Sequence, residues 1–449
     1  LASSALVGTA LAQDQGSSIG KRALDFYFTQ DNNQDAIKWD WDDQRGWYTV
    51  MFSWRTTNAQ SIALYEKLHG ALAQWRAKGV KIFGVCSDTK ELFDEFTRDR
   101  PLGAFEQHIW GRVLSEAFNL GHEPSIIIID QFGIIRWRGD ANDRWEERLE
   151  WFMEGSPPLS ADAKYIGQLM RDAEKAESAG DFGKAYTFAK FTEQITDNGS
   201  SDNSRAASLK DKLEGRAVEW MKEAVAANAA GDHEKAARII AQIVVRFGRD
   251  PEEDDGTRRI LNQPQRQQGA GDKQDTRTQL IKDTEAEMAQ MYADRKVRDL
   301  IETQRKNARA EVANEWAEQL ERRDHLEMAR TVYKATKEKF KDTDAAKTAE
   351  GAKAAEAAYD RLMKDKKALS SIEAARAEEM GFRYYDLGER YEQTGLYDLA
   401  REHYEKVLKD YAKTRIAPWA KKQLDKLPAS DDKNESAKAD GAGAEKKTP

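Results

Sequence analysis

The chain has 449 residues, of which 40% are hydrophobic and 33% are charged. Its 71 lysines and arginines face 79 aspartates and glutamates, and the net charge of −8 excludes a generally basic nucleic-acid-binding protein. The single cysteine excludes a disulfide framework, a zinc ribbon and an intrachain Cys-x-x-Cys pair. The six histidines are scattered without metal-ligand spacing, so we expect neither a metal nor a cofactor.

The first residues have the pattern of the end of an export signal. Small and apolar residues lead to Ala10-Leu11-Ala12, which fits the small-x-small sequence before a signal-peptidase cut. We interpret residues 1–21 as a signal-peptide remnant and linker, with an ordinary disordered start as the alternative. No later run approaches the roughly 18 apolar residues of a membrane span. These features predict an exported periplasmic, cell-envelope or extracellular protein without a transmembrane segment.

Two composition regimes divide the chain at a Gly-Ser-Pro-Pro sequence, residues 155–158. Nine of the twelve tryptophans and all β-type runs precede it, whereas the sequence from Leu159 onward is rich in Ala, Glu and Lys with helical periodicity. Two segments, residues 250–277 and the tail 429–449, carry too few large apolar groups to form a core. We therefore predict domains at 22–153 and 159–428, with a polar insert and a disordered tail.

Alternating strand and helix patterns predict an α/β fold for residues 22–153. Apolar runs predict strands at 48–54, 80–86, 124–130 and 134–137, and helical spacing of apolar residues predicts helices at 58–75, 89–97 and 142–152. The order is a β-α-β unit followed by a β-hairpin and a helix.

Sequence details within this order resemble the thioredoxin-like superfamily, with periplasmic thiol-disulfide oxidoreductases and peroxiredoxin relatives as the closest branch. The segments that carry the resemblance are YTVMFSW, GVKIFGVCSD and EPSIIIIDQFGIIRWRGD. In that family a Trp-Cys-x-x-Cys motif follows the first core strand and opens a helix. The resemblance aligns Trp54 with the family tryptophan and places Arg55 and Asn58 at the two cysteine positions. Pro124 matches the family's cis-proline, which lies beside the active disulfide, so we expect a cis bond before it.

Both family thiols are therefore missing. Disulfide exchange requires a thiolate of lowered pKa, which neither Arg55 nor Asn58 supplies, and Asn58 fits a helix N-cap better. The lone Cys86 ends a predicted core strand, and we interpret it as a small buried hydrophobe. The alternative is a reactive thiol that forms mixed disulfides. We predict no catalytic residue and no enzymatic activity.

The many tryptophans suit either core packing or a peptide-binding groove. Core packing is the expectation for most of them. Trp39, Trp41 and Trp47 lie in the polar stretch IKWDWDDQRGW and are our candidates for exposed protein contacts. Trp54 and Pro124 are further protein-binding candidates.

A turn-and-alanine pattern recurs four times after residue 159. A small or polar turn residue is followed by an apolar or aromatic residue two positions later and by alanine five positions later. The turns are Gly180, Gly231, Asp324 and Gly395, and the alanines are Ala185, Ala236, Ala329 and Ala400. This pattern resembles the turn and second helix of tetratricopeptide repeats. The irregular turn spacing predicts lengthened helices or divergent hairpins between the copies.

The fold class predicted overall is α/β plus all-α, a thioredoxin-like domain followed by a helical-hairpin array. Aromatic residues of the last copy, above all Tyr391, Tyr397 and Tyr404, are candidates for exposed protein contacts, with packing between helices as the alternative. We predict a non-catalytic interaction scaffold of the bacterial cell envelope that binds other proteins or itself, and no nucleic acid. The alternatives are a thiol oxidoreductase or peroxidase relative acting through Cys86, and a chaperone-like peptide binder.

Overall fold

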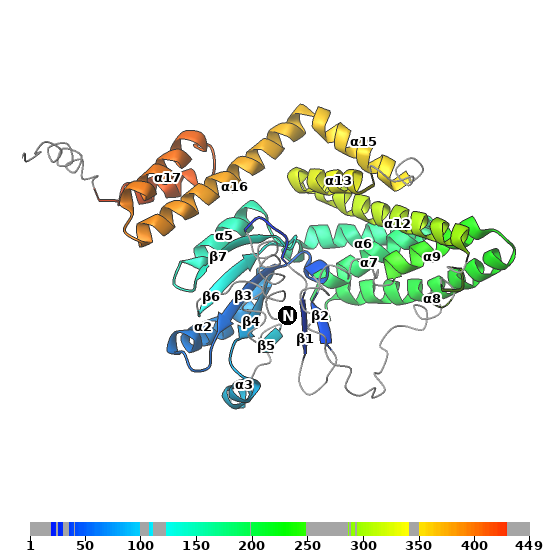
Figure 1. Cartoon of the computed structure of the whole chain (residues 1–449), viewed down its shortest axis with the longest axis horizontal. Helices are drawn as coiled ribbons and strands as arrows, with labels where there is room; N and C mark the ends of the chain where they lie inside the picture. Colours follow the sequence, from blue (N-terminus) through cyan, green and yellow to red (C-terminus); the bar gives the residue numbers. More distant parts are fainter. Residues whose placement is uncertain are drawn as a thin grey trace, which may run out of the picture. The chain divides into compact units, whose positions relative to one another are not determined.

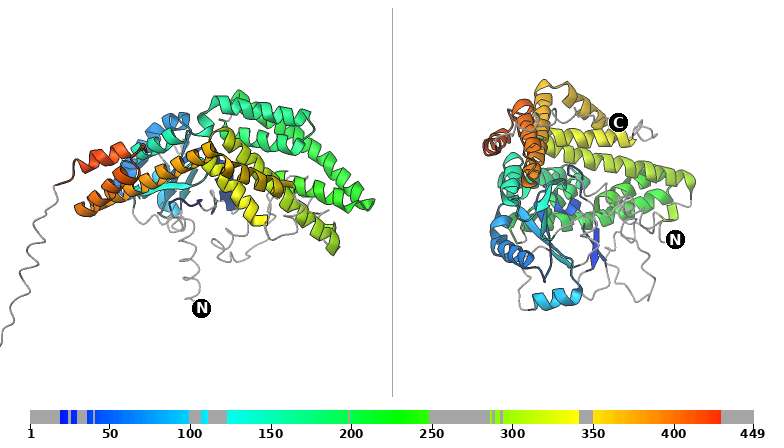
Figure 2. Two further views of the ribbon diagram at one scale, coloured as in Figure 1. Left: turned by 90° about the horizontal axis from the view of Figure 1, so that it is seen from above. Right: turned by 60° about the vertical axis from the view of Figure 1, so that its left-hand side comes forward.

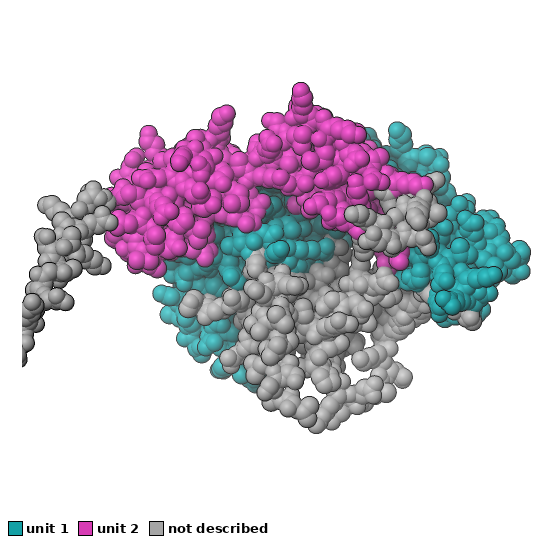
Figure 3. Space-filling model, turned by 45° about the horizontal axis from the view of Figure 1, so that its top comes forward, with its two compact units in different colours: residues 1–305 teal, residues 306–449 magenta. Residues whose placement is uncertain are grey.

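The computed structural model describes most of the chain in two compact units, residues 1–305 and 306–449 (Figure 3). The described residues are 19–98 except 24–25, 30–35 and 40, then 107–110, 123–247 except 198, 286, 289–291, 294–340 and 350–428. Residues 1–18, the polar insert 250–277 and the tail 429–449, on which three of the sequence predictions fall, lie outside them.

A five-stranded mixed sheet forms the centre of the first domain in unit 1 (Figure 1). Its strands, in the order β5-β4-β3-β6-β7, are Gln107–Trp110, Val80–Cys86, Tyr48–Trp54, Ser125–Ile129 and Ile135–Asp140. β3 pairs parallel with β4 and antiparallel with β6. Every residue of β3 and β6 is buried, as expected for central strands that are covered on both faces. A separate two-stranded sheet joins β1 (Phe26–Thr29) and β2 (Ala36–Trp39).

Helices complete this α/β domain. They are the short 3-10 helix η1 (Trp41–Gln44), α2 (Ala59–Ala77), α3 (Lys90–Thr97) and α5 (Trp145–Gly155). α2 packs on β3 and β4 and buries an apolar stripe that includes Leu64, Leu68 and Leu72. The predicted β-α-β unit, hairpin and closing helix are confirmed, whereas β1, β2, η1 and β5 were not predicted.

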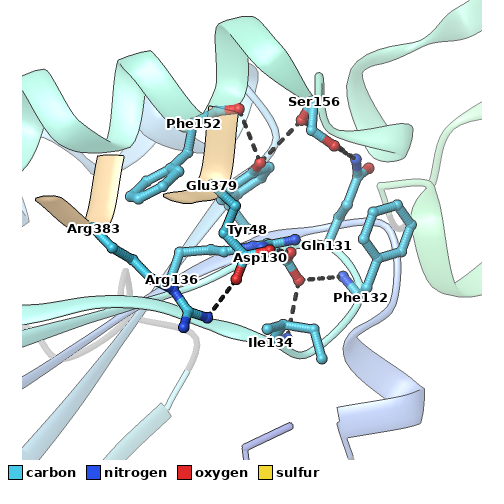
Figure 4. A network of polar contacts seen from close by, with 10 residues as sticks. All are labelled: Tyr48, Asp130, Gln131, Phe132, Ile134, Arg136, Phe152, Ser156, Glu379 and Arg383. Atoms are coloured by element: carbon cyan, nitrogen blue, oxygen red, sulfur yellow. Dashed lines mark hydrogen bonds and ion pairs between the residues drawn. The ribbon is translucent and has the colours of Figure 1, made fainter. Parts of the chain in front are cut away.

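The junction between this domain and the helices that follow is tightly bonded (Figure 4). The buried Gln131 donates from Nε2 to Ser156 Oγ at 2.8 Å and accepts the backbone N–H of Leu159 at 2.8 Å. Tyr48 donates its hydroxyl to the carbonyl of Ser156 at 3.0 Å. Residues 155–158 therefore form a packed joint rather than a free linker.

The remainder of the described chain is helical. After η2 (Leu159–Ala161), unit 1 contains α6 (Ala163–Ser178), α7 (Phe182–Ile195), α8 (Ser201–Ala229) and α9 (His233–Phe247). α12 (Arg295–Arg322) begins in unit 1 and continues into unit 2, which adds α13 (Leu326–Phe340), α15 (Glu350–Lys364), α16 (Lys366–Gln393), α17 (Tyr397–Asp410) and α18 (Ala417–Leu424). Consecutive helices α6 to α9 pack side by side (Figure 2). No strand occurs among the described residues of 159–428.

All four predicted turns connect helical hairpins. Gly180, Gly231 and Gly395 have φ of +79°, +81° and +76°, and Asp324 has φ of +59°. Each helix closes with the same two backbone hydrogen bonds, for example Gly231 N to Asn228 O and Asp232 N to Ala227 O. The alanine of every copy is fully buried. The helical hairpins are thus confirmed, and the long α8, α12 and α16, of 29, 28 and 28 residues, explain the irregular spacing.

Two exposed glycines of the same hairpin offer a matched test of these turns. Gly231→Ala is expected to destabilise the protein by about 1 kcal/mol, because an L-residue is strained at positive φ even where no atom crowds its Cβ. Gly215→Ala, in the middle of α8 and equally uncrowded, is expected to stabilise it by about 0.5–1 kcal/mol. Urea unfolding of both variants measures the two changes in unfolding free energy, which should have opposite signs. Changes of the same sign would contradict the positive φ of Gly231.

Candidate functional site at the start of helix α2

Sheet pairing brings three loops together where the family's redox motif would lie. Trp54 at the end of β3 is opposite Cys86 at the end of the parallel strand β4. Ser53 is opposite Ser125, the first residue of the antiparallel strand β6. The segments that follow Trp54 and Cys86 and the one that precedes Ser125 therefore meet at one edge of the sheet.

Polar side chains tie these loops to one another. Arg55 Nε forms an ion pair with Glu123 and donates a hydrogen bond to Ser87 Oγ at 3.0 Å. Asn58 caps α2, as predicted, by accepting the backbone N–H of Ser61 at 3.0 Å. Its amide also donates to the carbonyl of Glu123 at 3.3 Å. Arg55 and Asn58 thus hold the loop in place and present no group capable of nucleophilic or redox chemistry.

A second set of bonds fixes the same loop from the side of β4. Asp88 Oδ2 accepts both the backbone N–H and the hydroxyl of Thr56, each at 2.6 Å. Between the paired strands β3 and β6, the buried hydroxyls of Ser53 and Ser125 are 2.8 Å apart. The loop is therefore bonded to the segments that follow β4 and precede β6, and its short, charge-assisted bonds favour a rigid conformation.

The Glu123–Pro124 peptide bond is cis, which confirms the expectation from the resemblance. Pro124 is buried. The carbonyl of Glu123 accepts from Asn58, and the carbonyl of Pro124 accepts from the backbone N–H of Ala141 at 3.3 Å. Backbone carbonyls on both sides of the cis bond are thus used within the chain.

Cys86 is fully buried at the end of β4. Burial raises the pKa of its thiol to about 12, and the nearby carboxylates of Asp88 and Glu123 act in the same direction. Backbone hydrogen bonds from Asp88 and Thr56 oppose the shift without cancelling it. The thiol therefore stays protonated at neutral pH, which suits the interpretation as a small hydrophobe.

Trp54 is a core residue, and its selection as a protein contact was wrong. Its side chain is fully buried, with ring centroids 4.9 Å from Tyr65, 5.2 Å from Phe96 and 6.1 Å from Phe93. The ring joins α2 and α3 to the sheet, which is a packing role.

The tryptophans in the polar stretch around residue 41 also differ from the prediction. Trp41 and Trp47, predicted to be exposed, are buried. Trp41 joins the core cluster that contains Phe83 and Ile127. Trp47 donates its indole N–H to the carbonyl of Gln194 in α7 at 2.9 Å. The side chain of Trp39 lies outside the described residues, although its backbone ends β2.

The three candidate tyrosines of the last hairpin differ in how far they are buried. Tyr404 is fully buried and donates to Glu392 Oε2 at 2.8 Å, so its predicted exposure is wrong. Tyr391 is half-buried and stacks on His403 with centroids 5.2 Å apart. Only Tyr397 is exposed, at 43%.

Other exposed apolar residues of this hairpin were missed. Besides Tyr397 they are Met380, Leu387, Leu396 and Leu399, exposed by 37%, 40%, 50% and 40%. Their exposure could be predicted from the sequence, because these residues fall outside the stripe that the alanine pattern assigns to the core.

Ser61 was also missed. It stands three residues after Asn58, with the spacing of a Cys-x-x-Cys pair, and is fully buried in the first turn of α2.

The fold and the comparisons define a class, a thioredoxin-like domain followed by a long helical region. Residues 19–138 match the AhpC/TSA family. Solved structures that resemble the domain include the thioredoxin domain of a thiol-disulfide oxidoreductase from Bacteroides vulgatus, with 18% identity over 30% of this chain and 97% of that one. A thiol:disulfide interchange protein from Bacteroides sp. has 19% identity over 31% and 92%. Both have a TM-score of 0.26. No curated protein shows a significant match to this chain.

Among the described residues, no three His, Cys, Asp or Glu side chains group as a metal site would require. None of their helices is both long and apolar enough to cross a membrane.

Proposed function

We propose that this protein is a non-catalytic interaction scaffold of the bacterial cell envelope. The observation that carries the proposal is the chemistry at the start of α2. Arg55 and Asn58 are bonded to Glu123 there, and the chain's one cysteine is buried and protonated. A domain of this class without an accessible thiolate has no means of disulfide exchange or peroxide reduction.

Protein binding is the role that the remaining features support. The hairpins share the closing turn and buried alanine of tetratricopeptide-like repeats, and stacked hairpins offer extended surfaces for partners. Leu396, Tyr397 and Leu399 add an exposed apolar tip to the last hairpin. Tyrosine is a common interface anchor. The export pattern that ends at Ala12 supports the envelope location.

The two alternatives have weaker support. A thiol enzyme acting through Cys86 requires that this fully buried side chain become accessible to a substrate. A peptide binder acting beside Pro124 requires backbone groups that here bond within the chain.

A turnover assay tests the proposed absence of catalysis. The full chain is expected to give no insulin reduction with dithiothreitol and no peroxide consumption above the background of its Cys86→Ser variant. A dithiol thioredoxin serves as the positive control. Turnover that disappears in Cys86→Ser would refute the non-catalytic function and favour the thiol enzyme.

A further inference from the structure

The last two helical hairpins repeat one construction. Helices α16 and α17 begin 71 residues after α12 and α13, and both long helices have 28 residues. Several side chains agree at this spacing. Among them are Ile301 with Ile372, Glu321 with Glu392, Ala329 with Ala400 and Tyr333 with Tyr404. In each copy the fully buried tyrosine is hydrogen-bonded to the glutamate, so the two hairpins can be compared position by position.

Each of these long helices also packs on the helices that precede it. Val297 and Ile301, in the N-terminal half of α12, lie in a core cluster with residues of α8 and α9. α16 packs on α13 and α15, and its residues at the corresponding positions, Ala368 and Ile372, are buried. The N-terminal half of a long helix thus continues the array from one hairpin to the next.

The following long helix reaches the tip of the preceding hairpin. In the tip of α13, residues 325–328, Glu327 accepts two hydrogen bonds from Arg330 at 2.8 and 2.7 Å. Arg376 of α16 donates a further one to the same carboxylate at 3.1 Å. All four residues of this tip are half-buried. The tip therefore receives both cover and a cation from its surroundings.

The corresponding tip of α17, residues 396–399, is exposed at all four positions. Leu396, Tyr397 and Leu399 are large apolar side chains with at least 40% of their surface exposed. Within the described residues, the one helix after α17 is α18, which has eight residues, so no long helix follows α17 as α16 follows α13. The two tips therefore differ in exposure where the next long helix of the array would pack.

The polar groups of the two tips differ in the same sense. Asp398 occupies the place of Glu327 but forms no ion pair within the described part of the chain. Arg401 occupies the place of Arg330, and its buried Nε has no hydrogen-bond partner there. Another nitrogen of Arg401 donates to the carbonyl of Pro428. The tip of α17 thus keeps the acidic residue without the arginine that α16 supplies to α13.

We propose that the tip of α17 binds an amphipathic helix of a partner protein, at the place that the next long helix of the array would occupy. The partner helix carries two apolar residues four positions apart and an arginine four positions further on, as Ala368, Ile372 and Arg376 do in α16. Its arginine pairs with Asp398. Residues 429–449 carry no large apolar side chain, so they do not supply this helix. The inference rests on the proposed scaffold function and names the partner of one of its surfaces.

A synthetic peptide of residues 365–380, the N-terminal half of α16, serves as the partner helix in the test. Isothermal titration calorimetry with the full chain is expected to show saturable binding. Asp398→Arg in the chain and Arg376→Glu in the peptide are each expected to weaken it at least about tenfold, because each brings like charges together. Combining the two variants restores opposite charges, so the binding is expected to return. Tyr397→Ala in the chain is also expected to weaken it.

Glu234→Arg in the chain is the matched control. Glu234 has the same place in the tip of α9 and is also exposed, but α12 already follows its hairpin, so binding is expected to be unchanged. Circular dichroism checks that each variant folds. No saturable binding at about 1 mM peptide, or binding that is insensitive to Asp398→Arg, would overturn the inference.

Occupation of the tip by a second copy is a distinct outcome. Sedimentation equilibrium of the full chain would then show a dimer that Asp398→Arg abolishes, and this result would also overturn the inference. None of these measurements depends on the turnover assay, so a failure of the inference can be distinguished from a failure of the proposed function.

Discussion

Replacing Trp54 by alanine is expected to lower the free energy of unfolding of the sheet domain by about 3–5 kcal/mol. The indole is fully buried among Tyr65, Phe93 and Phe96, so its removal leaves a cavity and breaks three aromatic contacts at once. Guanidinium unfolding of the full chain, followed by near-ultraviolet circular dichroism, measures the loss.

The matched control is Tyr397→Ala in the last hairpin. Because this side chain is 43% exposed, the change in unfolding free energy is expected to stay within about 0.5 kcal/mol. The pair distinguishes a core aromatic from a surface aromatic, which the sequence analysis had grouped together. A Trp54→Ala variant as stable as the parent protein would contradict the core assignment.

Local signals made much of the fold predictable. Strands β3 and β4 were predicted at their observed ends, because each is a mostly apolar run that is followed by a polar residue, Arg55 or Ser87. The four helical turns were found from a glycine or aspartate and an alanine at fixed spacing. Those residues act through local physics, since positive φ favours glycine and close helix packing requires a small side chain.

The short strands β1, β2 and β5 were missed for the opposite reason. Each has four residues, too few for a periodic pattern to emerge. β5 also depends on pairing with β4, which lies outside any local window, whereas β1 and β2 pair with each other. Such short strands are therefore the least predictable part of this domain.

Contacts between residues far apart in the sequence determine whether each candidate site residue is buried or exposed. Trp47 lies in a polar stretch, yet its partner Gln194 is 147 positions further along the chain. Tyr397 and Tyr404 lie on the same side of α17, but Tyr397 is its first residue and is exposed, whereas Tyr404 is buried against Tyr385 of α16. The absence of thiols at Arg55 and Asn58 required no such contact, so the lack of a Cys-x-x-Cys redox pair could be read from the sequence alone.

Cys86 is expected to be almost inert in the folded protein. With its pKa raised from 9.0 to about 12, the thiolate fraction at pH 8 falls about a thousandfold, and burial further hinders the approach of any reagent. The same shift predicts a pH effect on stability. Above pH 9 the unfolded chain loses this proton while the folded chain keeps it, so stability falls as the pH rises toward 12.

The rate of Cys86 alkylation by iodoacetamide is the most direct test of a thioredoxin-like domain without usable thiol chemistry. The full chain at pH 8 should react at least about a thousandfold more slowly when native than when unfolded in guanidinium, as measured by intact-mass spectrometry. Cys86→Ser, which should gain no label, controls for reaction at other side chains. A native rate equal to or above the unfolded rate would show an accessible, activated thiolate and contradict the account.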